Sequence, residues 1–291
     1  MKNKNFTLIA IFLSFILVSC SGEETKQTIK DSAVGGVYAE YLFCDFGPDM
    51  SEESFQGLLK DWNNILDDLG PNSVPRSVGL TPRVETDLFD GLWVLVWPSK
   101  EASLVGWQEW VDGPAADWTE KTSSIISCGA SSNGIVQNYG FDVSFLRTPN
   151  VVDEVPGGVV GFNFCSYTEG FQEEQLIASS QEYNQWLDAA SDAAGRDSYW
   201  YSIHVPDFET PIPGSTAGAY DYAFHHVWDS EESREAGSAL FASTAPAVQG
   251  PQADCNPEMA LYDSMMFRTT CLLYTSPSPR DQRGSRMPCS G

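Results

Sequence analysis

The chain of 291 residues carries the same succession of landmarks twice. Each half has an aromatic strand ending in cysteine, a helix carrying a tryptophan, a second aromatic strand ending in tryptophan, and a further cysteine. The paired landmarks lie about 120 to 130 residues apart and are Cys44 with Cys165, Trp62 with Trp186, Trp97 with Trp228, and Cys128 with Cys255. Four landmarks in one order at a near-constant offset indicate an internal duplication, which constrains the architecture before any residue is assigned a chemical role.

The first 20 residues have the layout of an export signal. Lys2 and Lys4 precede an apolar run over 6–18 that is short for a membrane span. The run ends in Leu17-Val18-Ser19-Cys20, which resembles a bacterial lipobox, and the resemblance implies that Cys20 becomes the lipidated N-terminus. The alternative is an ordinary cleaved signal with a chance cysteine.

Ser21 follows this cysteine, and in signals of that family a residue other than aspartate favours the outer membrane. We therefore predict an outer-membrane lipoprotein on the periplasmic or cell-surface side, with the lipid bilayer as its partner through Cys20. The stretch 23–34 is polar and lacks periodicity, so residues 21–36 are predicted to form a flexible tether.

The C-terminal segment 271–291 does not resemble the rest of the chain. Residues 271–281 resemble the translation of a transposase-type sequencing adapter, and 285–288 fit the far end of such an adapter. We predict a non-native tail, and the alternative is a disordered native terminus. The segment is left out of the fold prediction.

The chain is strongly acidic, with 40 aspartates and glutamates against 16 lysines and arginines and a formal net charge of −24. Neutralising phosphates requires clustered basic side chains, so no nucleic acid partner is expected. Close electrostatic contact with anionic lipid is disfavoured too, which leaves anchoring to the lipid on Cys20. The simplest interpretation of the charge is a solvated surface that keeps an exported protein soluble.

Four cysteines remain once Cys20 and the two cysteines of the tail are set aside, two in each half. Exported proteins fold in an oxidising space, so disulfides are expected. No Cys/His spacing suggests a metal site. Three pairings are possible in principle, and the duplication favours closure of each half on itself. This predicts the disulfides Cys44–Cys128 and Cys165–Cys255.

Each half of the chain follows the order strand, helix, strand, strand, helix, strand. In the first half, the apolar side chains of 51–69 recur at helical spacing, and Gly70 ends that helix. The last strand of this half is expected near 135–141. The order is that of the ferredoxin-like split βαβ fold. We predict an α+β fold of two such βαββαβ repeats, packed sheet to sheet as an intramolecular α/β barrel, with repeat one at 37–146, a linker at 147–158 and repeat two at 159–270.

This topology and the duplication make the chain similar to the dimeric α/β-barrel superfamily in its fused, tandem form. That group includes antibiotic-biosynthesis-type monooxygenases, haem-degrading enzymes and chlorite-dismutase-like haem proteins. The resemblance covers about residues 37–268 and matches no family motif residue for residue, so it implies the fold and leaves the function open. Haem is the cofactor that the resemblance would suggest.

Alternation along the strands predicts which side chains face the shared interior. Aromatic walls with a few convergent polar groups are typical of a ligand pocket. The predicted ligand-binding residues are Glu40, Arg83, Trp93, Trp97, Trp200, Ser202 and Trp228. All three histidines of the chain lie in the second half, and the candidate catalytic residues are His226, His204 and Asn163.

Several of these candidates also have a purely structural interpretation. Trp97 and Trp228 would equally serve to join the two sheets. Glu40 would form a buried ion pair with Arg83 that has no catalytic duty. His225, next to His226, would make a pair with one packed and one exposed ring.

Two functional hypotheses follow, because the sequence contains no nucleophile elbow, phosphate loop or paired-carboxylate signature. The first is an exported, membrane-anchored lipoprotein that binds a small apolar or aromatic ligand, or a partner, in the barrel interior. The alternative is an oxidoreductase, monooxygenase-like or haem-dependent, or an isomerase of the barrel superfamily. A third hypothesis, without a binding or catalytic function, is a purely structural envelope protein.

Overall fold

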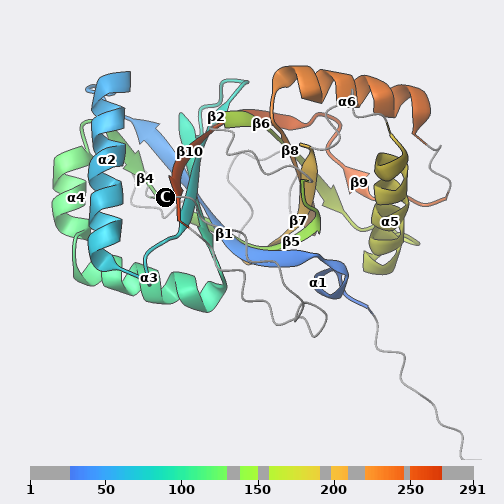
Figure 1. Ribbon diagram of the computed structural model, residues 1–291, viewed down its shortest axis with the longest axis horizontal. Coiled ribbons are helices and arrows are strands. Elements are labelled where there is room, and N and C mark those ends of the chain that lie inside the picture. Colours follow the sequence, from blue (N-terminus) through green and yellow to red (C-terminus); the bar gives the residue numbers. More distant parts are fainter. Residues whose placement is uncertain are drawn as a thin grey trace, which may run out of the picture.

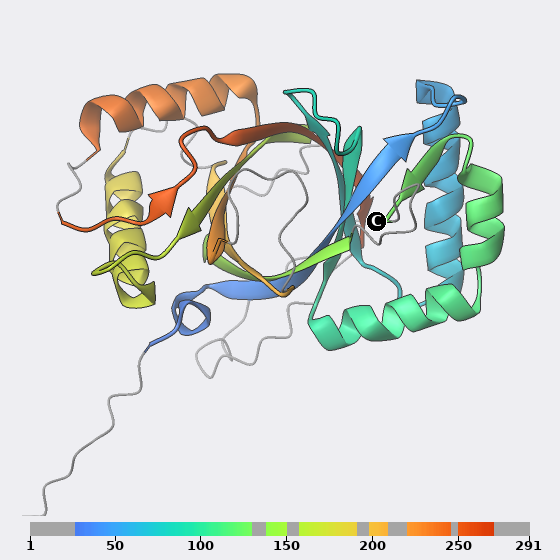
Figure 2. The ribbon, with the colours of Figure 1, turned by 180° about the vertical axis from the view of Figure 1, so that it is seen from behind.

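The computed structural model describes residues 27–129, 138–149, 157–190, 198–208, 220–245 and 250–270. Their strands close into one barrel, and two layers of helices flank it on opposite sides (Figures 1 and 2). The predicted α+β fold, with two ferredoxin-like repeats forming one intramolecular barrel, is confirmed. The predicted signal peptide, the lipidation site Cys20 and the tail 271–291 lie outside the described residues.

Repeat one contains the predicted order of elements with two additions, the helix α4 and the short strand β4. Its elements are β1 (Gly35–Phe46), α2 (Glu52–Leu69), β2 (Arg76–Pro82), β3 (Gly91–Trp97), α3 (Lys100–Asp112), α4 (Ala115–Thr122), β4 (Ile126–Cys128) and β5 (Asn138–Arg147). The last strand therefore runs further than the sequence suggested.

Repeat two follows the same plan. Its elements are β6 (Gly157–Ser166), α5 (Glu173–Ala189), β7 (Trp200–Pro206), β8 (Tyr222–Trp228), α6 (Glu231–Thr244), β9 (Asp254–Cys255) and β10 (Ala260–Thr269). In each repeat the first strand lies between the third and the fourth, as the ferredoxin-like order requires.

The two sheets join edge to edge. Strand β5 of repeat one pairs antiparallel with β7 of repeat two, and β10 of repeat two pairs antiparallel with β2 of repeat one. Strand β10 also pairs with β6, which closes the ring. Without the short β4 and β9, eight of the ten strands form this barrel. The open faces of both sheets therefore share one interior, which an eight-stranded barrel can fill with side chains.

Both predicted disulfides are present. Cys44 bonds to Cys128 and Cys165 bonds to Cys255, with sequence separations of 84 and 90 residues. The short strands explain the geometry, because β4 pairs with the end of β1 so that Cys44 faces Cys128, and β9 does the same for Cys165 and Cys255.

The helix α2 shows how the sequence builds the outer layers. Ser51 caps its first turn by accepting a hydrogen bond from the N–H of Ser54, and Gly70 ends it with a φ of 84°. Its buried residues Leu58, Leu59, Trp62 and Leu66 recur at helical spacing and pack on the sheet. None of the helices in the described part of the chain is both long and apolar enough to cross a membrane.

The segment before β1 differs from the predicted flexible tether. Residues Ile29–Ser32 form the helix α1, which Thr28 caps. Ile29 is 3% exposed, packs into the apolar cluster of repeat two and donates its backbone N–H to Glu173 Oε1 over 2.8 Å. The prediction is therefore wrong for residues 27–36, because one buried isoleucine holds this stretch against α5.

Candidate functional site

The barrel interior and the helix-covered face carry different sets of side chains. Members of the interior cluster come from both repeats and include Ala39, Tyr41, Phe43, Val94, Phe141, Phe162 and Ala223. Along β1 and β3 the alternate residues, among them Leu42, Trp93, Leu95 and Trp97, pack against the helices of repeat one. The alternation itself was predicted correctly, but for these strands the two faces were exchanged.

The exchange removes several predicted residues from the interior. Trp93 and Trp97 face the helices of repeat one, and Glu40 hydrogen-bonds to Trp97 on that same side. Trp228 packs in the helix-side cluster of repeat two, and His226 stacks on it. Asn163 alternates with the interior residues Phe162 and Phe164, which places it on the helix side as well.

The two faces were exchanged in the sequence prediction because these strands carry apolar residues on both. One face is covered by helices and the other by the opposite wall of the barrel, so the pattern of alternating polarity that marks an exposed face is missing. On β3 the helix side carries Trp93 and Trp97, while Val94 belongs to the barrel cluster together with aromatic residues such as Tyr41 and Phe162.

Strand β7 does direct its predicted residues into the barrel. Tyr41 Oη lies 2.9 Å from His204 Nε2, and Ser202 Oγ lies 3.1 Å from His225 Nδ1. The rings of His204 and His225 are 4.8 Å apart, and Trp200 packs on His225. The sequence hypothesis missed His225 as the interior histidine, because it was built on the neighbouring His226.

Within this histidine cluster His204 is enclosed, whereas His225 is half-buried. His204 is 2% exposed and is surrounded by the rings of Tyr41, Phe141 and Phe162. Burial lowers the pKa of His204 to about 3. Burial, followed by repulsion from the two adjacent imidazoles, holds the pKa of His225 well below its ordinary value. Both rings are therefore neutral near pH 7 and act as parts of a packed polar network.

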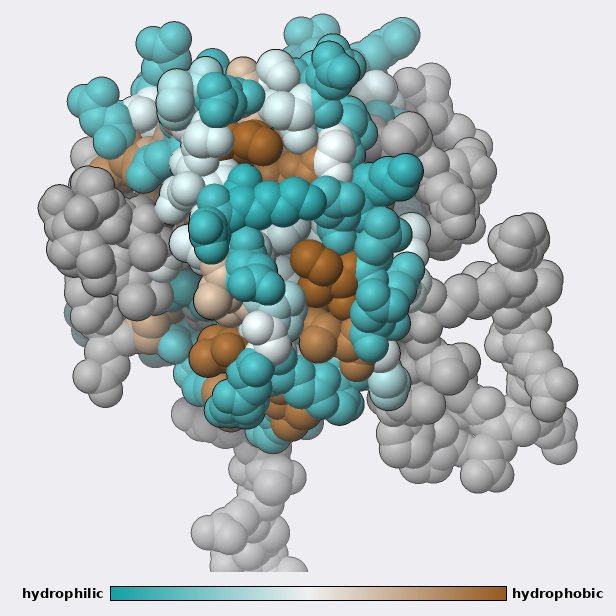
Figure 3. All heavy atoms as spheres, turned by 90° about the vertical axis from the view of Figure 1, so that its left-hand side faces the viewer, coloured by the Kyte–Doolittle hydropathy of each residue, from teal (hydrophilic) through white to brown (hydrophobic). Residues whose placement is uncertain are grey.

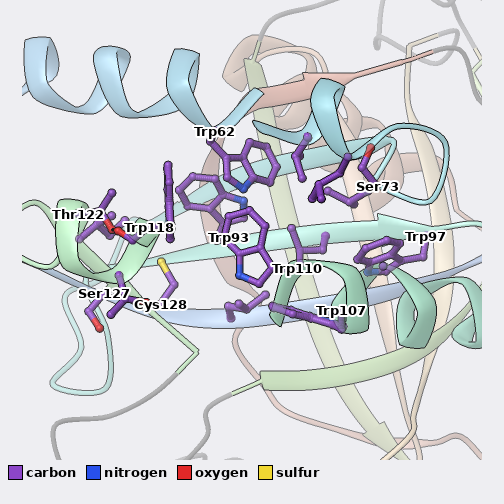
Figure 4. Close-up of a pocket in the computed structure, with 18 of the residues that line it drawn as sticks. Trp62, Ser73, Trp93, Trp97, Trp107, Trp110, Trp118, Thr122, Ser127 and Cys128 are labelled. Atoms are coloured by element: carbon purple, nitrogen blue, oxygen red, sulfur yellow. The ribbon is translucent and has the colours of Figure 1, made fainter. Parts of the chain in front are cut away.

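The described residues enclose a pocket elsewhere, between the sheet and the helices of repeat one. Its volume is about 240 Å³. Six of the nine tryptophans of the chain line it, namely Trp62, Trp93, Trp97, Trp107, Trp110 and Trp118. Figure 4 shows Trp62, Trp93 and Trp110 around its centre, with Trp97 and Trp107 at one end and Trp118 and Cys128 at the other.

Four elements supply these indoles. Trp93 and Trp97 lie on the same face of β3, Trp62 comes from α2, and the remaining three come from α3 and α4. The helix α3 approaches β3 closely because Gly106 lies against the ring of Trp97. Seen from outside, this helix layer is mostly hydrophilic, with small separate apolar patches (Figure 3).

Glu40 lies behind two walls of this tryptophan pocket. Its Oε2 accepts hydrogen bonds from Trp97 Nε1 and Trp107 Nε1, each over 2.7 Å, and Asn138 Nδ2 lies 3.4 Å from Oε1. The residue is 7% exposed. Burial raises the pKa of Glu40, and the hydrogen bonds from Trp107, Trp97 and Asn138 oppose that rise.

Arg83 belongs to neither site. Its guanidinium forms ion pairs with Glu231 of α6 and Asp263 of β10 at the outer end of β2. The alternative of a buried pair with Glu40 is therefore wrong, because Arg83 links the two repeats near the surface instead.

The described residues show no site that fits haem. His204 is 2% exposed and its Nε2 atom is hydrogen-bonded to Tyr41 Oη. The ring of His225 packs against Phe162 and Trp200, and the ring of His226 stacks on Tyr199 and Trp228. The tryptophan pocket has no histidine in its lining, and its Cys128 is held in a disulfide. Its volume also lies below the range of roughly 300 to 1,000 Å³ usual for larger ligands.

Comparison with known proteins finds no matching family model and no matching curated protein. Among solved structures, a chlorite dismutase variant from Candidatus Nitrospira defluvii has 10% sequence identity and a TM-score of 0.46, over 80% of this chain and 93% of that one. A protein provisionally described as a monooxygenase from Fusobacterium nucleatum subsp. nucleatum has 9% identity and a TM-score of 0.43, over 80% and 93%. The likeness concerns the course of the backbone, and no functional residue is carried over from it.

Proposed function

We propose that this protein is an exported, lipid-anchored binding protein that holds a small aromatic or apolar molecule in the tryptophan pocket. The observation that supports the proposal is the convergence of six of the nine tryptophans on one cavity. Tryptophans that only stabilised a core would be expected to fill the space between them, and here they surround it.

The size and lining of the pocket indicate the class of ligand. An apolar cavity of roughly 150 Å³ accommodates benzene, so about 240 Å³ suits a molecule of one or two fused rings. The indole faces provide stacking surfaces. The hydroxyls of Ser73, Thr119 and Thr122 also line the pocket, and because each donates its hydrogen to a backbone carbonyl, its oxygen can act only as an acceptor. The ligand site of the sequence hypothesis thus moves from the barrel interior to the helix side of repeat one.

The N-terminal sequence is the basis for proposing export and lipid anchoring. The lipobox-like Leu17-Val18-Ser19-Cys20 supports attachment to the outer membrane through lipid on Cys20. Replacing Cys20 with alanine should release the protein from the membrane fraction. Recovery of this variant with the membranes would contradict the anchor.

Calorimetric titration of the full chain with 1-methylnaphthalene, a neutral two-ring probe, tests the binding site. The informative variant is Trp110→Ala, which removes a half-buried wall of the pocket on α3. We expect it to weaken binding about tenfold, which corresponds to roughly 1.4 kcal/mol. The matched control is Trp186→Ala, which removes a half-buried helix tryptophan of repeat two that packs on Tyr183 and Phe241.

The control variant should bind the probe as the wild type does. Equal losses in both variants would assign the effect to general destabilisation. Absence of binding to the wild type would remove the proposed function.

An oxidoreductase of the barrel superfamily is the second candidate, and the buried contact between Tyr41 and His204 is the observation that favours it. An absorbance spectrum of the purified protein, with and without added haemin, tests the haem-dependent form. A stoichiometric Soret band would overturn the conclusion that the described residues do not fit haem and would support this candidate. A flat spectrum would leave the binding protein as the conclusion.

A further inference from the structure

We propose that the ligand of the tryptophan pocket is a small organic cation, recognised by indole faces that the carboxylate of Glu40 makes more electron-rich. The inference rests on the proposed binding function and specifies its ligand class. It is carried by the two hydrogen bonds that Glu40 Oε2 accepts from Trp97 and Trp107.

The first step concerns the charge of Glu40. A carboxylate taken out of water is normally paired with a cation. None of the ion pairs in the described part of the chain includes Glu40. Its bonds come from the two indoles and the amide of Asn138. Among the described residues, Glu40 is therefore held by neutral hydrogen-bond donors and has no cationic partner.

The second step concerns the indoles. The face of an indole carries negative electrostatic potential and attracts cations, most strongly where water is excluded. A hydrogen bond from the ring N–H to a carboxylate polarises the ring and increases that potential. Trp97 and Trp107 both make this bond and both line the pocket. The pocket lining itself contains no charged side chain among the described residues, so nothing there offsets the field.

The third step uses the duplication as an internal control. Tyr38 pairs with Trp97 in repeat one as Val159 pairs with Trp228 in repeat two, which makes Gly161 the counterpart of Glu40. At Gly161 a side chain would meet Met259 and the ring of Trp228. The helix α6, the counterpart of α3, contains no tryptophan. Both the carboxylate and the extra indoles are confined to one copy, so the repeat fold does not need them.

The overall charge favours the same class of ligand. A formal net charge of −24 raises the local concentration of cations and speeds their association. Six indoles around one cavity resemble, in chemistry, the aromatic cages that bind quaternary ammonium groups.

The test compares two probes of nearly the same shape. N-methylquinolinium is a cation, and 1-methylnaphthalene is its neutral counterpart. A purely apolar pocket would prefer the neutral probe, because the cation is more costly to remove from water. We expect calorimetric titration of the full chain to show at least tenfold tighter binding of the cation.

The matched variant is Glu40→Gln, which keeps the size of the side chain and removes its charge. We expect it to abolish the preference for the cation, because the glutamine oxygen can still accept from the two indoles but carries no charge. If Glu40→Gln does not fold, Trp107→Phe takes its place, since it keeps an aromatic ring and loses the N–H bond to Glu40. Its control is Trp110→Phe, whose indole makes no hydrogen bond to Glu40 in the described structure.

The outcomes separate this inference from the proposed function. Binding of both probes with equal affinity, or a cation preference that survives Glu40→Gln or Trp107→Phe, would overturn the cationic ligand and leave a neutral aromatic one. Failure of both probes to bind would overturn the pocket itself as a site, and the inference with it.

Discussion

Trp97 Nε1 donates to Glu40 Oε2 over 2.7 Å, and Trp107 donates to the same oxygen from α3. One carboxylate oxygen therefore ties the helix to two neighbouring strands of the sheet. Both indole N–H groups would lose their acceptor without Glu40 Oε2. The two hydrogen bonds therefore hold Trp97 and Trp107 in position as walls of the tryptophan pocket and also polarise their rings.

Glu40 should give stability an unusual pH dependence. Burial raises its pKa above the ordinary carboxyl value of 4.5, so between these two values the folded chain holds more protons than the unfolded chain. The contribution of Glu40 to the free energy of unfolding is therefore fully present below pH 4.5 and is lost as the pH rises through the folded pKa. Urea unfolding of the wild type and of Glu40→Gln between pH 4 and 8 measures the difference in free energy of unfolding between the two proteins. The stability of the wild type relative to the variant should fall with rising pH, and a constant or rising difference would contradict the prediction.

Two glycine-to-alanine substitutions should have opposite effects. A Cβ at Gly106 of α3 would lie 2.7 Å from the backbone oxygen of Asn72 and would overlap the ring of Trp97. We expect Gly106→Ala to cost about 1–3 kcal/mol through overpacking. At Gly57 of α2 a Cβ would meet nothing within 4 Å, so Gly57→Ala should stabilise by about 0.5–1 kcal/mol through helix propensity. Thermal unfolding of both variants measures the contrast, and a gain in stability from Gly106→Ala would show that α3 is not held against the sheet.

The two disulfides should contribute nearly equal stability. They close loops with sequence separations of 84 and 90 residues, for which the loop-entropy model gives about 4 kcal/mol each. Replacing Cys44 and Cys128 with alanine, or Cys165 and Cys255, should each lower the free energy of unfolding by this order. Urea unfolding under non-reducing conditions measures both. A difference of more than about 2 kcal/mol between the variants would contradict loop closure as the common cause.

His204 should make the fold sensitive to acid. Its pKa is lowered to about 3 by burial, whereas 6.5 is its ordinary value. Between these values the unfolded chain binds more protons, so stability rises with pH across this window and is lost as the pH falls towards 3. The contribution is of the order of 5 kcal/mol at about 1.36 kcal/mol for each unit of pKa. Removing His204 should remove this part of the pH dependence.

The informative variant is His204→Phe, compared with Tyr41→Phe. At neutral pH, His204→Phe leaves the buried hydroxyl of Tyr41 without its partner, which should cost about 1–3 kcal/mol. Tyr41→Phe loses the same contact and keeps the histidine, so its acid sensitivity should match that of the wild type. Equal pH profiles for His204→Phe and the wild type would show that His204 is not the titrating group.

Much of the fold follows from local signals in the sequence. The helix from Glu52 to Leu69 begins after a capping serine and ends at a glycine, and both ends are visible in the residues themselves. The duplication led directly to the disulfides, because each pair of cysteines has the same place in its repeat. The short strands β4 and β9 carry too few residues for a periodic pattern, so they appear only in the folded structure.

The candidate site depended on information that the sequence does not contain. Strands β1 and β3 are apolar on both faces, so alternation separates Trp93, Trp97 and Glu40 from their neighbours without saying which set faces the barrel. Sequence alone determined the repeat, the order of elements and the cysteine pairing, since each depends on spacing along the chain. Only the tertiary structure decided that six tryptophans from four elements surround one cavity beside a buried carboxylate, because packing between distant segments selects the face that each strand turns towards the helices.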